Sequence, residues 1–545
     1  MQCQIKNFLP VFLTVSFFSS PMPLLAGDFS ATCANLLLNG AMLSADCQNG
    51  NGKINRSTVN LNQLITNHLG HFQWQIDGGF YGSVQHCFIA DAATLNCELG
   101  DGRGGWHKDS LNLNTHITNS WGKLVSDIDS SSTSSHRLSQ LMTRGTQIIN
   151  VDNNMPVQLR GVNLGGLFVT EMWMTPMVTS KSDNQPHDNY SLIKTLDNRF
   201  GIEKERELLN AYQQTWITKE DLQRIRQRGF NAVRLPIWYG QFYPVDHVSN
   251  DTFRWEAFNE LDRIINGASS VGLYVILDMH GVVGGQSCSD STGHSGPDSN
   301  EDGTGQPCSG TNDTNRFWSN QSDQGNTQWL WWQIANHYKG NQTIAGYDLI
   351  NEPRGAHSKL QVWNAYDNLY KTVRSVDPDH IIFMEGAFGG YGQWNWDALP
   401  DPATYQWKNV VYEMHEYQWS GTSPEVQNGA TRQVDDFKRH QSWNVPGYIG
   451  EFNAMTGNAA DWADSIKKYD DAGLSWTMWT YKSSNGAVGT LSGHWGWFDV
   501  NSRCYTGEIK CWMPNVNSDI FDWIMTDWQQ WQTTHAFSEN TDFQF

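Results

Sequence analysis

Residues 345–353 read Ala-Gly-Tyr-Asp-Leu-Ile-Asn-Glu-Pro. The stretch begins as a short, mostly apolar run and ends in polar groups, a pattern typical of a buried strand that carries functional residues at its end. Similar runs recur along the second part of the chain, between stretches with helical patterns such as 219–228 and 363–376. The predicted strands are 159–163, 231–236, 273–279, 345–351, 380–386, 410–415, 447–451 and 474–480.

Eight buried strands with helical crossovers predict an α/β fold, the TIM or (β/α)₈ barrel. A doubly wound sheet would carry a Gly-rich phosphate turn after its first strand. Leu164-Gly165-Gly166 does not match that turn, and no helical pattern follows it. The barrel is therefore the predicted fold of residues 142–545.

Polar or aromatic residues stand at the ends of most predicted strands. Any one of them alone could cap a strand or form a surface ion pair, but together they predict a site, because catalytic groups of such barrels collect at the C-terminal ends of the strands. The candidates are Arg234, His280, Asn351, Glu352, His415, Tyr417, Glu451 and Trp479.

Two carboxylates dominate this set. Glu352 and Glu451 follow the fourth and seventh predicted strands, which places them across the barrel mouth from each other. Cleavage of a glycosidic bond needs one protonated carboxyl group and one ionised carboxylate. We expect Arg234 to lower the pKa of Glu451 and the surroundings of Glu352 to raise its pKa. Glu385 and Glu416 are interpreted as structural.

The motifs around these residues resemble glycoside hydrolase family 5 of clan A. They are Arg234-Leu235-Pro236, Asp278-Met279-His280-Gly281, Leu349-Ile350-Asn351-Glu352-Pro353, His415-Glu416-Tyr417, Ile449-Gly450-Glu451-Phe452 and Met478-Trp479-Thr480. The resemblance implies that Glu352 is the acid/base and Glu451 the nucleophile. It also implies that Arg234 and Tyr417 contact the nucleophile, that Asn351 binds the substrate 2-hydroxyl, and that His280, His415 and Trp479 line the reacting subsite.

The first barrel segment is similar to the exo-β-1,3-glucanase branch of that family. The similar stretches are Arg160–Gly166, Glu171, Thr175-Pro176 and Trp216–Asp221, whereas Leu167 and Met172 depart from the branch. Glu171 is expected either to bind a terminal glucose or to form an ion pair at the barrel mouth. The cellulase branch stays open.

The N-terminal region contains a repeat. Asn60-Leu61-Asn62, Ile65-Thr66-Asn67 and Gly70 recur in the same order at 112–114, 117–119 and 122, and each copy is preceded by a cysteine pair. Short Leu-rich segments bounded by Asn and Gly predict strands and turns. The copies resemble the cyanovirin-N homology family, which implies an all-β, two-repeat, carbohydrate-binding domain at 27–125. Residues 80–86 depart from the opening of the first copy. The alternative is a spacer that binds nothing.

Two segments flank this domain. Residues 1–26 contain Lys6 and an apolar run from Phe8 to Phe18, the pattern of a secretory signal peptide. That run is too short to span a membrane, so we expect no membrane anchor. Residues 126–141 are Ser-rich and predict a flexible linker. The localisation that follows is secreted, either extracellular or periplasmic.

The mature chain would hold eight cysteines in close sequential pairs. An even count in an exported chain predicts disulfides rather than a metal site. The expected pairs are Cys33/Cys47, Cys87/Cys97, Cys288/Cys308 and Cys504/Cys511. Within the loop 281–316, Asp298, Asn300, Asp302 and Gly303 match the opening of a calcium loop, but its twelfth position is Ser309 where a bidentate Glu is needed. We expect no metal and no cofactor.

Composition limits the partners. The formal net charge is −20, which disfavours nucleic acid. A mean hydropathy of −0.53 excludes a polytopic membrane protein. The 26 Trp residues favour sugars, whose rings stack on indole faces.

The predicted function is a secreted, retaining glycoside hydrolase that cleaves β-glucosidic bonds in β-glucans by a two-glutamate double displacement. It would be an endo-β-1,4-glucanase (cellulase) or an exo-β-1,3-glucanase. Its partners would be a β-glucan or related polysaccharide at the barrel and a glycan at the N-terminal domain, and we expect a monomer. The alternatives are a carbohydrate-binding adhesin with an inactive barrel and a β-glucan transglycosylase.

Overall fold

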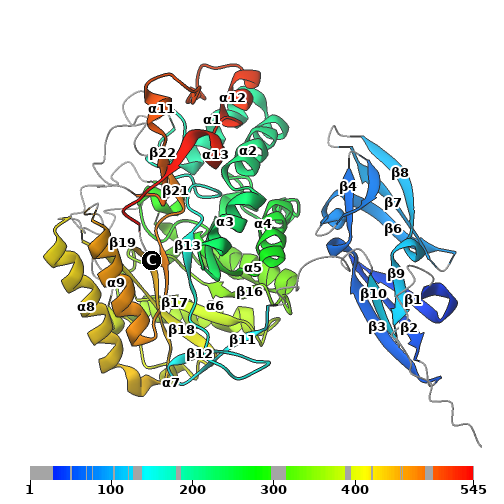
Figure 1. The fold of residues 1–545 in the computed structure, drawn as a ribbon, viewed down its shortest axis with the longest axis horizontal. Helices are drawn as coiled ribbons and strands as arrows, with labels where there is room; N and C mark the ends of the chain where they lie inside the picture. Colours follow the sequence, from blue (N-terminus) through cyan, green and yellow to red (C-terminus); the bar gives the residue numbers. More distant parts are fainter. Residues whose placement is uncertain are drawn as a thin grey trace, which may run out of the picture. The chain divides into compact units, whose positions relative to one another are not determined.

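A computed structural model gives the fold, and it divides the chain into two compact units, 1–133 and 134–545 (Figure 1). The predicted signal peptide, most of the predicted linker, Cys308 and the calcium-like residues lie outside the described residues. The described residues are 29–49, 52–68, 70–75, 78–91, 93–101, 105–120, 122–126, 138–178, 186–295, 315–386, 395–418, 421–454, 456, 458–484 and 495–543.

The second unit is a closed barrel of eight parallel strands in chain order, which confirms the predicted fold. Strand β13 pairs with β14 on one side and with β20 on the other, where Arg160 lies opposite Trp476, so the first and last strands meet at a seam. The strands are β13 (Arg160–Asn163), β14 (Ala232–Trp238), β15 (Tyr274–Gly281), β16 (Ile344–Asp348), β17 (Ile381–Glu385), β18 (Val410–Tyr417), β19 (Gly447–Asn453) and β20 (Ser475–Met478).

Helices cover the outside of this barrel (Figure 1). Helix α3 begins as predicted because Thr218 and Asp221 form a capping box. Helix α6 begins four residues before the predicted 363, since Ser358 caps it by accepting from the backbone N–H of Gln361. The helices are α1 (Asn189–Phe200), α2 (Ile202–Trp216), α3 (Lys219–Gln227), α4 (Ala257–Val271), α5 (Gln321–Tyr338), α6 (Lys359–Arg374), α7 (Pro402–Tyr405), α8 (Ser423–Arg439) and α9 (Ala459–Ala472).

The two ends of the barrel differ in chemistry. At the N-terminal end, the hairpin β11 (Leu141–Arg144) and β12 (Gln147–Asn150) buries Leu141 and Ile148 in an apolar cluster with the first residues of several strands, such as Ala232 and Ile381. The C-terminal ends carry the polar side chains instead. The apolar end therefore closes the barrel, and the polar end is left for a site.

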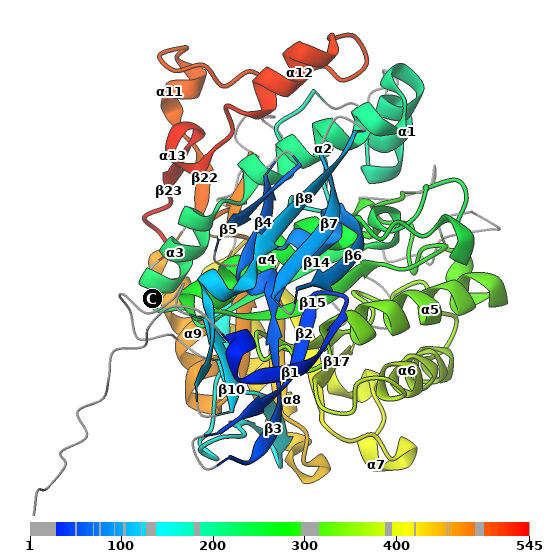
Figure 2. The same ribbon diagram turned by 90° about the vertical axis from the view of Figure 1, so that its right-hand side faces the viewer.

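The chain adds a small outer layer after β20. Strands β21 (Lys482–Ser483), β22 (Phe498–Val500) and β23 (Phe537–Glu539) form a sheet, and helix α12 (Phe521–Trp528) packs on α2 (Figure 2). Two short helices, α11 (Ser502–Tyr505) and α13 (Thr533–Ala536), complete this layer. No helix among the described residues combines the length and the hydropathy that crossing a lipid bilayer requires.

The N-terminal unit is all-β and consists of two similar copies. Each copy has a three-stranded antiparallel sheet followed by a hairpin. The strands of the first copy are β1 (Cys33–Asn39), β2 (Met42–Gln48), β3 (Ile54–Asn60), β4 (Ile65–His68) and β5 (His71–Trp74). Those of the second copy are β6 (Val84–Ala90), β7 (Thr94–Gly100), β8 (Trp106–Asn112), β9 (Ile117–Ser120) and β10 (Lys123–Ser126).

The repeated sequence motif forms the same structure twice. Asn60 caps a 3₁₀ helix by accepting from the backbone N–H of Asn62 (3.0 Å), and Asn112 does the same for Asn114 (3.0 Å). The openings also match: Phe29 and Phe80 each start a 3₁₀ helix and are fully buried. Residues 80–83 thus form the same 3₁₀ helix as residues 29–31, although the two sequences differ. The shared feature is the buried phenylalanine at the first position of each helix.

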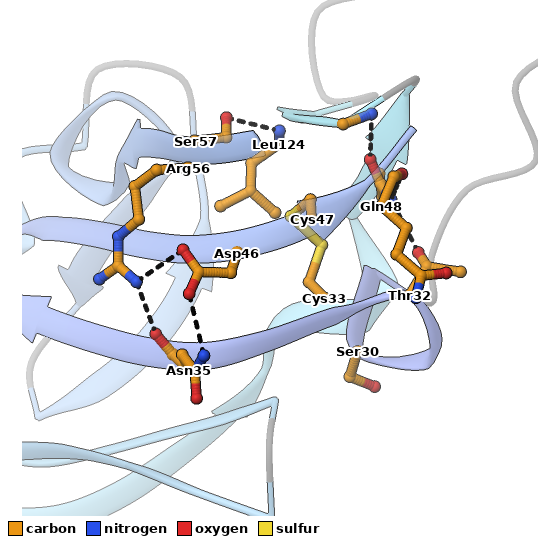
Figure 3. The surroundings of a disulfide bond; sticks show 12 residues. Ser30, Thr32, Cys33, Asn35, Asp46, Cys47, Gln48, Arg56, Ser57 and Leu124 are labelled. Carbon is orange, nitrogen blue, oxygen red and sulfur yellow. Dashed lines mark hydrogen bonds and ion pairs between the residues drawn. A yellow bond between two sulfur atoms is a disulfide. The ribbon is translucent and has the colours of Figure 1, made fainter. Parts of the chain in front are cut away.

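The two copies hold each other together. Leu124 of β10 donates its backbone N–H to Ser57 Oγ of β3 (2.9 Å), beside the Cys33–Cys47 disulfide that joins β1 to β2 (Figure 3). Next to this disulfide, Asp46 accepts hydrogen bonds from Asn35 and Arg56, both at 2.9 Å (Figure 3). The hairpin of the second copy is therefore part of the structure of the first.

Disulfides occur in both units. Cys33–Cys47, Cys87–Cys97 and Cys504–Cys511 are bonded as predicted. Cys288 is also disulfide-bonded, and its predicted partner Cys308 lies outside the described residues.

Replacing Cys33 and Cys47 together by Ser should destabilise the N-terminal unit by about 3 kcal/mol, because the disulfide closes a loop of 14 residues in the unfolded chain. Calorimetry of the full chain measures this, since each unit has its own core and should melt separately. The matched control, Cys504→Ser with Cys511→Ser, should move the barrel transition instead. A shift of the barrel transition in the first variant would contradict the independence of the units.

Candidate active site

A buried guanidinium organises the C-terminal end of the barrel. Arg234 of β14 has no exposed surface and donates to Glu451 Oε1 (2.8 Å), Asp348 Oδ2 (2.7 Å) and Asn351 Oδ1 (3.0 Å). Asp278 (3.1 Å) and Glu413 (3.3 Å) also lie within ion-pair distance. Burial acts to lower the pKa of Arg234, but these carboxylates outweigh it and raise the pKa well above its ordinary value.

Glu451 is held at both oxygens. Arg234 Nη1 donates to Oε1, and the Tyr417 hydroxyl at the end of β18 donates to Oε2 (2.8 Å). Because two strands on different sides supply these donors, the carboxylate has one orientation.

Glu352 lies in the loop after β16, since that strand ends at Asp348 rather than at Asn351 as predicted. Its φ of +42° is in the left-handed region, which an L-residue with a long side chain seldom adopts. The Glu385 carboxylate accepts the backbone N–H of Glu352 and supports this conformation. The strained backbone therefore has a dedicated partner at the end of β17.

Two cations bind the Glu352 carboxylate. Arg354 Nη2 lies 2.7 Å from Oε2, and His415 Nδ1 donates to Oε1 (3.1 Å). Burial acts to raise the pKa of Glu352, but Arg354 and His415 outweigh it and lower the pKa to about 2. The expectation that the pKa of Glu352 is raised is wrong for the free protein, because the charge of Arg354, two residues further along the chain, lowers it.

His415 links several acids. Its Nε2 donates to Glu413 Oε1 (3.3 Å), while Nδ1 also lies 3.4 Å from Glu385 and 3.5 Å from Glu451. Burial would lower the pKa of His415, but Glu385 and the other carboxylates raise it well above its usual value. His415 is thus a second buried cation.

The remaining predicted residues form one wall of the site. His280 stacks on Trp479, with ring centroids 5.4 Å apart, and contacts the Asn351 amide (3.5 Å). Its Nδ1 donates to Asp278 (2.6 Å), and burial lowers its pKa to about 4, so its ring is neutral at pH 7. The structure therefore brings together all eight residues predicted at the strand ends.

Glu171 lies close enough to the site for the charges of Glu352 and Glu451 to affect its pKa. It is buried and accepts a hydrogen bond from the Trp173 indole (2.9 Å). Burial raises its pKa, and Asp290 and the two site glutamates raise it further. Among the described residues it forms no ion pair, so that alternative receives no support.

The two predicted glutamates face each other. One oxygen of Glu352, one of Glu451 and one nitrogen of His415 lie within 4.8 Å of one another, a cluster that could hold a cation by distance alone. However, Arg354, Arg234 and Tyr417 already bind the carboxylate oxygens. A closest approach within 4.8 Å is compatible with the ~5–5.5 Å between carboxyl groups that act on one reacting carbon through a covalent intermediate.

Sequence reasoning missed part of the site. Glu385, interpreted as structural, contacts both His415 and the Glu352 backbone, whereas Glu416 pairs with Arg432 and Gln433 away from the site. Glu385 is the last side chain of the predicted strand 380–386, before Gly386, and this position was a usable signal. Arg354 directly follows Glu352-Pro353, and its charge was the signal there. Asn163, Asp278, Asp348 and Glu413 also contact Arg234.

Two family models match the chain. One is described as Cellulase (glycosyl hydrolase family 5) and matches residues 194–485, more than half of the chain. The other is described as a CVNH domain and matches residues 29–125.

Curated relatives match the barrel region. A protein named beta-xylosidase from Phanerodontia chrysosporium is 28% identical over 63% of this chain and 71% of its own length. A probable glucan 1,3-beta-glucosidase A from Aspergillus niger is 28% identical over 48% of this chain and 55% of its own length. The match thus spans about half of the second relative. A solved rutinosidase from Aspergillus niger is 18% identical, covers 62% of this chain and 93% of that chain, and has a TM-score of 0.48.

Arg354→Ala should raise the pKa of Glu352 from about 2 by roughly one to three pH units, because the nearest cation is removed while burial remains. Carbon-13 NMR titration of protein labelled at glutamate carboxyl carbons measures this, and Glu352→Gln identifies the resonance. Arg354→Lys keeps the charge and should largely keep the low pKa. An unchanged pKa in Arg354→Ala would show that Arg354 does not control this carboxylate.

Proposed function

Because the chain belongs to glycosyl hydrolase family 5, we propose that it cleaves β-glucosidic bonds in β-glucans with retention of anomeric configuration. As a member of this family it is a glycoside hydrolase. The observation that carries the finer proposal is the pair Glu352 and Glu451, whose oxygens lie within 4.8 Å while Arg234 and Tyr417 fix the second carboxylate.

In the first step the Glu451 carboxylate attacks the anomeric carbon and forms a glycosyl ester. The bond to the leaving oxygen breaks, and that oxygen takes the proton of Glu352. In the second step Glu352 takes a proton from water, whose oxygen attacks the same carbon and releases Glu451. Arg234 and Tyr417 already point at the carboxylate that must leave as an anion, so no reorganisation is needed.

The acid step needs a proton on Glu352, whose pKa is about 2 in the free protein. The glycosidic oxygen must approach the carboxyl group that Arg354 contacts. We propose that the substrate displaces this contact. Burial is then opposed chiefly by His415, so the pKa of Glu352 rises from its low value in the free protein, which favours the protonated acid in the complex.

The remaining site residues suit a pyranose bound above Trp479. An indole face packs against ring C–H groups, and the Asn351 amide can both donate to and accept from a hydroxyl. Arg234 orients the Asn351 side chain, which lies beside His280. We propose that this amide binds the 2-hydroxyl of the pyranose. Glu171 is proposed to bind the terminal glucose.

The preferred substrate is a β-1,3-glucan attacked from its end. The relative from Aspergillus niger, named a probable glucan 1,3-beta-glucosidase A, and the Arg160–Gly166 segment support this choice. The CVNH region is proposed to bind glycan and so to keep the barrel near polysaccharide. Export is proposed as well, since disulfides persist in oxidising compartments.

Reducing-sugar release from laminarin, carboxymethylcellulose and mannan tests the substrate. We expect turnover of laminarin with glucose as the first product, because attack from the chain end releases single residues. An aryl β-xyloside is the comparison for the relative named beta-xylosidase. Products longer than the substrate would indicate transglycosylation. No turnover of any substrate would favour the adhesin with an inactive barrel.

Variants of the two glutamates test the mechanism. Glu451→Gln should lose at least about 10³-fold in kcat on every substrate, because no covalent intermediate forms. Glu352→Ala should retain the first step on a dinitrophenyl β-glucoside, whose leaving group needs no proton, and then stall.

Azide needs no deprotonation, so it should rescue Glu352→Ala and give a β-glycosyl azide. A β-glycosyl azide from Glu451→Ala, or an α-azide from Glu352→Ala, would reverse the two roles, because azide attacks from the face where the removed carboxyl group stood. Only a few-fold loss in both variants would mean that the chemistry lies elsewhere.

A further inference from the structure

A cavity lies among outer helices of the barrel and the segments that follow two of its strands. It has a volume of about 340 Å³ and is lined by α1, α2, the start of α4 and the segments that follow β13 and β14. None of the predicted strand-end residues lines it, nor does Glu171. Its volume is at the lower end of the ~300–1,000 Å³ usual for small-molecule sites. The cavity is therefore separate from the catalytic centre and too small for a polymer.

Glu205 of α2 is a buried carboxyl group that lines this cavity. It is 1% exposed, and its Oε2 has no hydrogen-bond partner among the described residues. Burial raises its pKa to about 7, partly offset by Arg206 and Arg254. A carboxyl group buried without a partner costs stability, whichever protonation state it adopts.

Arg254 lines the same cavity from the segment before α4. It is 8% exposed, and in the described part of the chain no carboxylate forms an ion pair with its side chain. Burial lowers its pKa and Arg206 lowers it further, while the charges of Glu205, Asp197 and Glu256 offset part of this effect. Arg206 pairs with Glu256 (3.2 Å), but its own Nε has no partner. Opposite charges thus face one cavity without closing into a pair.

Groups of both charges that are only partly compensated restrict the ligand. An anion would meet the Glu205 carboxyl group, and a cation would meet Arg254 and Arg206. A neutral molecule with hydroxyl groups can accept from the guanidinium and also bond the carboxyl group. Amide side chains, which donate and accept, line the same space at Asn210 and Gln213. The chemistry is that of a sugar or a similar polyol.

We propose that this cavity is a second carbohydrate site that binds one neutral pyranose between Glu205 and Arg254. Apolar residues that line the cavity, among them Leu167 and Leu192, suit the ring C–H groups. The site does not depend on the reaction proposed for the barrel, since it shares no residue with the proposed catalytic set.

Hydrogen exchange of the full chain locates binding and so separates this cavity from the catalytic centre and the CVNH region. The probes are D-glucose, D-xylose and myo-inositol. We expect at least one of them, at about ten times its dissociation constant, to slow the slowest exchange in peptides covering 202–216 and 238–260 roughly tenfold.

Glu205→Leu should lose this protection. Its barrel should nevertheless melt at an equal or higher temperature without ligand, because an unpaired buried carboxyl group has been removed. Glu205→Gln is the matched control and should keep at least part of the protection. Arg254→Met is the second variant and should also lose it, so one poorly folding variant does not decide the question.

Three results would overturn the proposal. The first is no protection of these peptides by any probe. The second is equal protection in Glu205→Leu or Arg254→Met and in the unmodified chain. The third is protection confined to the peptides that contain Glu352 and Glu451 or to the CVNH region. A lower melting temperature of Glu205→Leu with unchanged protection would assign Glu205 a structural role only.

Discussion

The ion cluster around Arg234 is the interaction on which the rest of the barrel mouth depends. A guanidinium with no exposed surface offers its N–H donors to carboxylates from β15, β16, β18 and β19. Removing one member would leave the others charged and buried without a partner. The free-energy cost of that is far larger than the net stabilisation that a buried ion pair provides. The contact that neutralises these acids therefore also fixes the relative position of five of the eight strands, β14 included.

The same cluster explains why no site carboxylate acts alone. Glu352 and Glu451 share the neighbour His415, which in turn contacts Glu413 and Glu385. A change of charge at His415 therefore acts on both catalytic carboxyl groups at once. Arg354 keeps 9% of its side chain exposed, whereas Arg234 and His415 are fully buried, so it is the cation of the three that an incoming substrate can reach.

The fold was predictable because it depends on patterns of apolar and polar residues that are short in sequence. Apolar runs of strand length, interrupted by helical stretches, predict the eight strands, and the residues at their ends predict the site. Side-chain partners are a different matter, since they depend on distances between segments far apart in the chain. Arg354 and Glu385 were visible in the sequence, but only the loop after β16 brings both to Glu352. The positive φ of Glu352 likewise has no signature in the residue type.

The seam of the barrel sets the order in which this chain can fold. Leu159 donates its backbone N–H to Ser475 Oγ across 316 residues of sequence, and the strands on either side of that seam cannot pair until both exist. The CVNH unit is built from residues 29–126 and has its own core, so it can form as soon as it is synthesised. During synthesis, the edges of β13 and β19 stay unpaired until β20 has been made. Chaperone dependence of this protein should thus reside in the barrel and end when the eighth strand arrives.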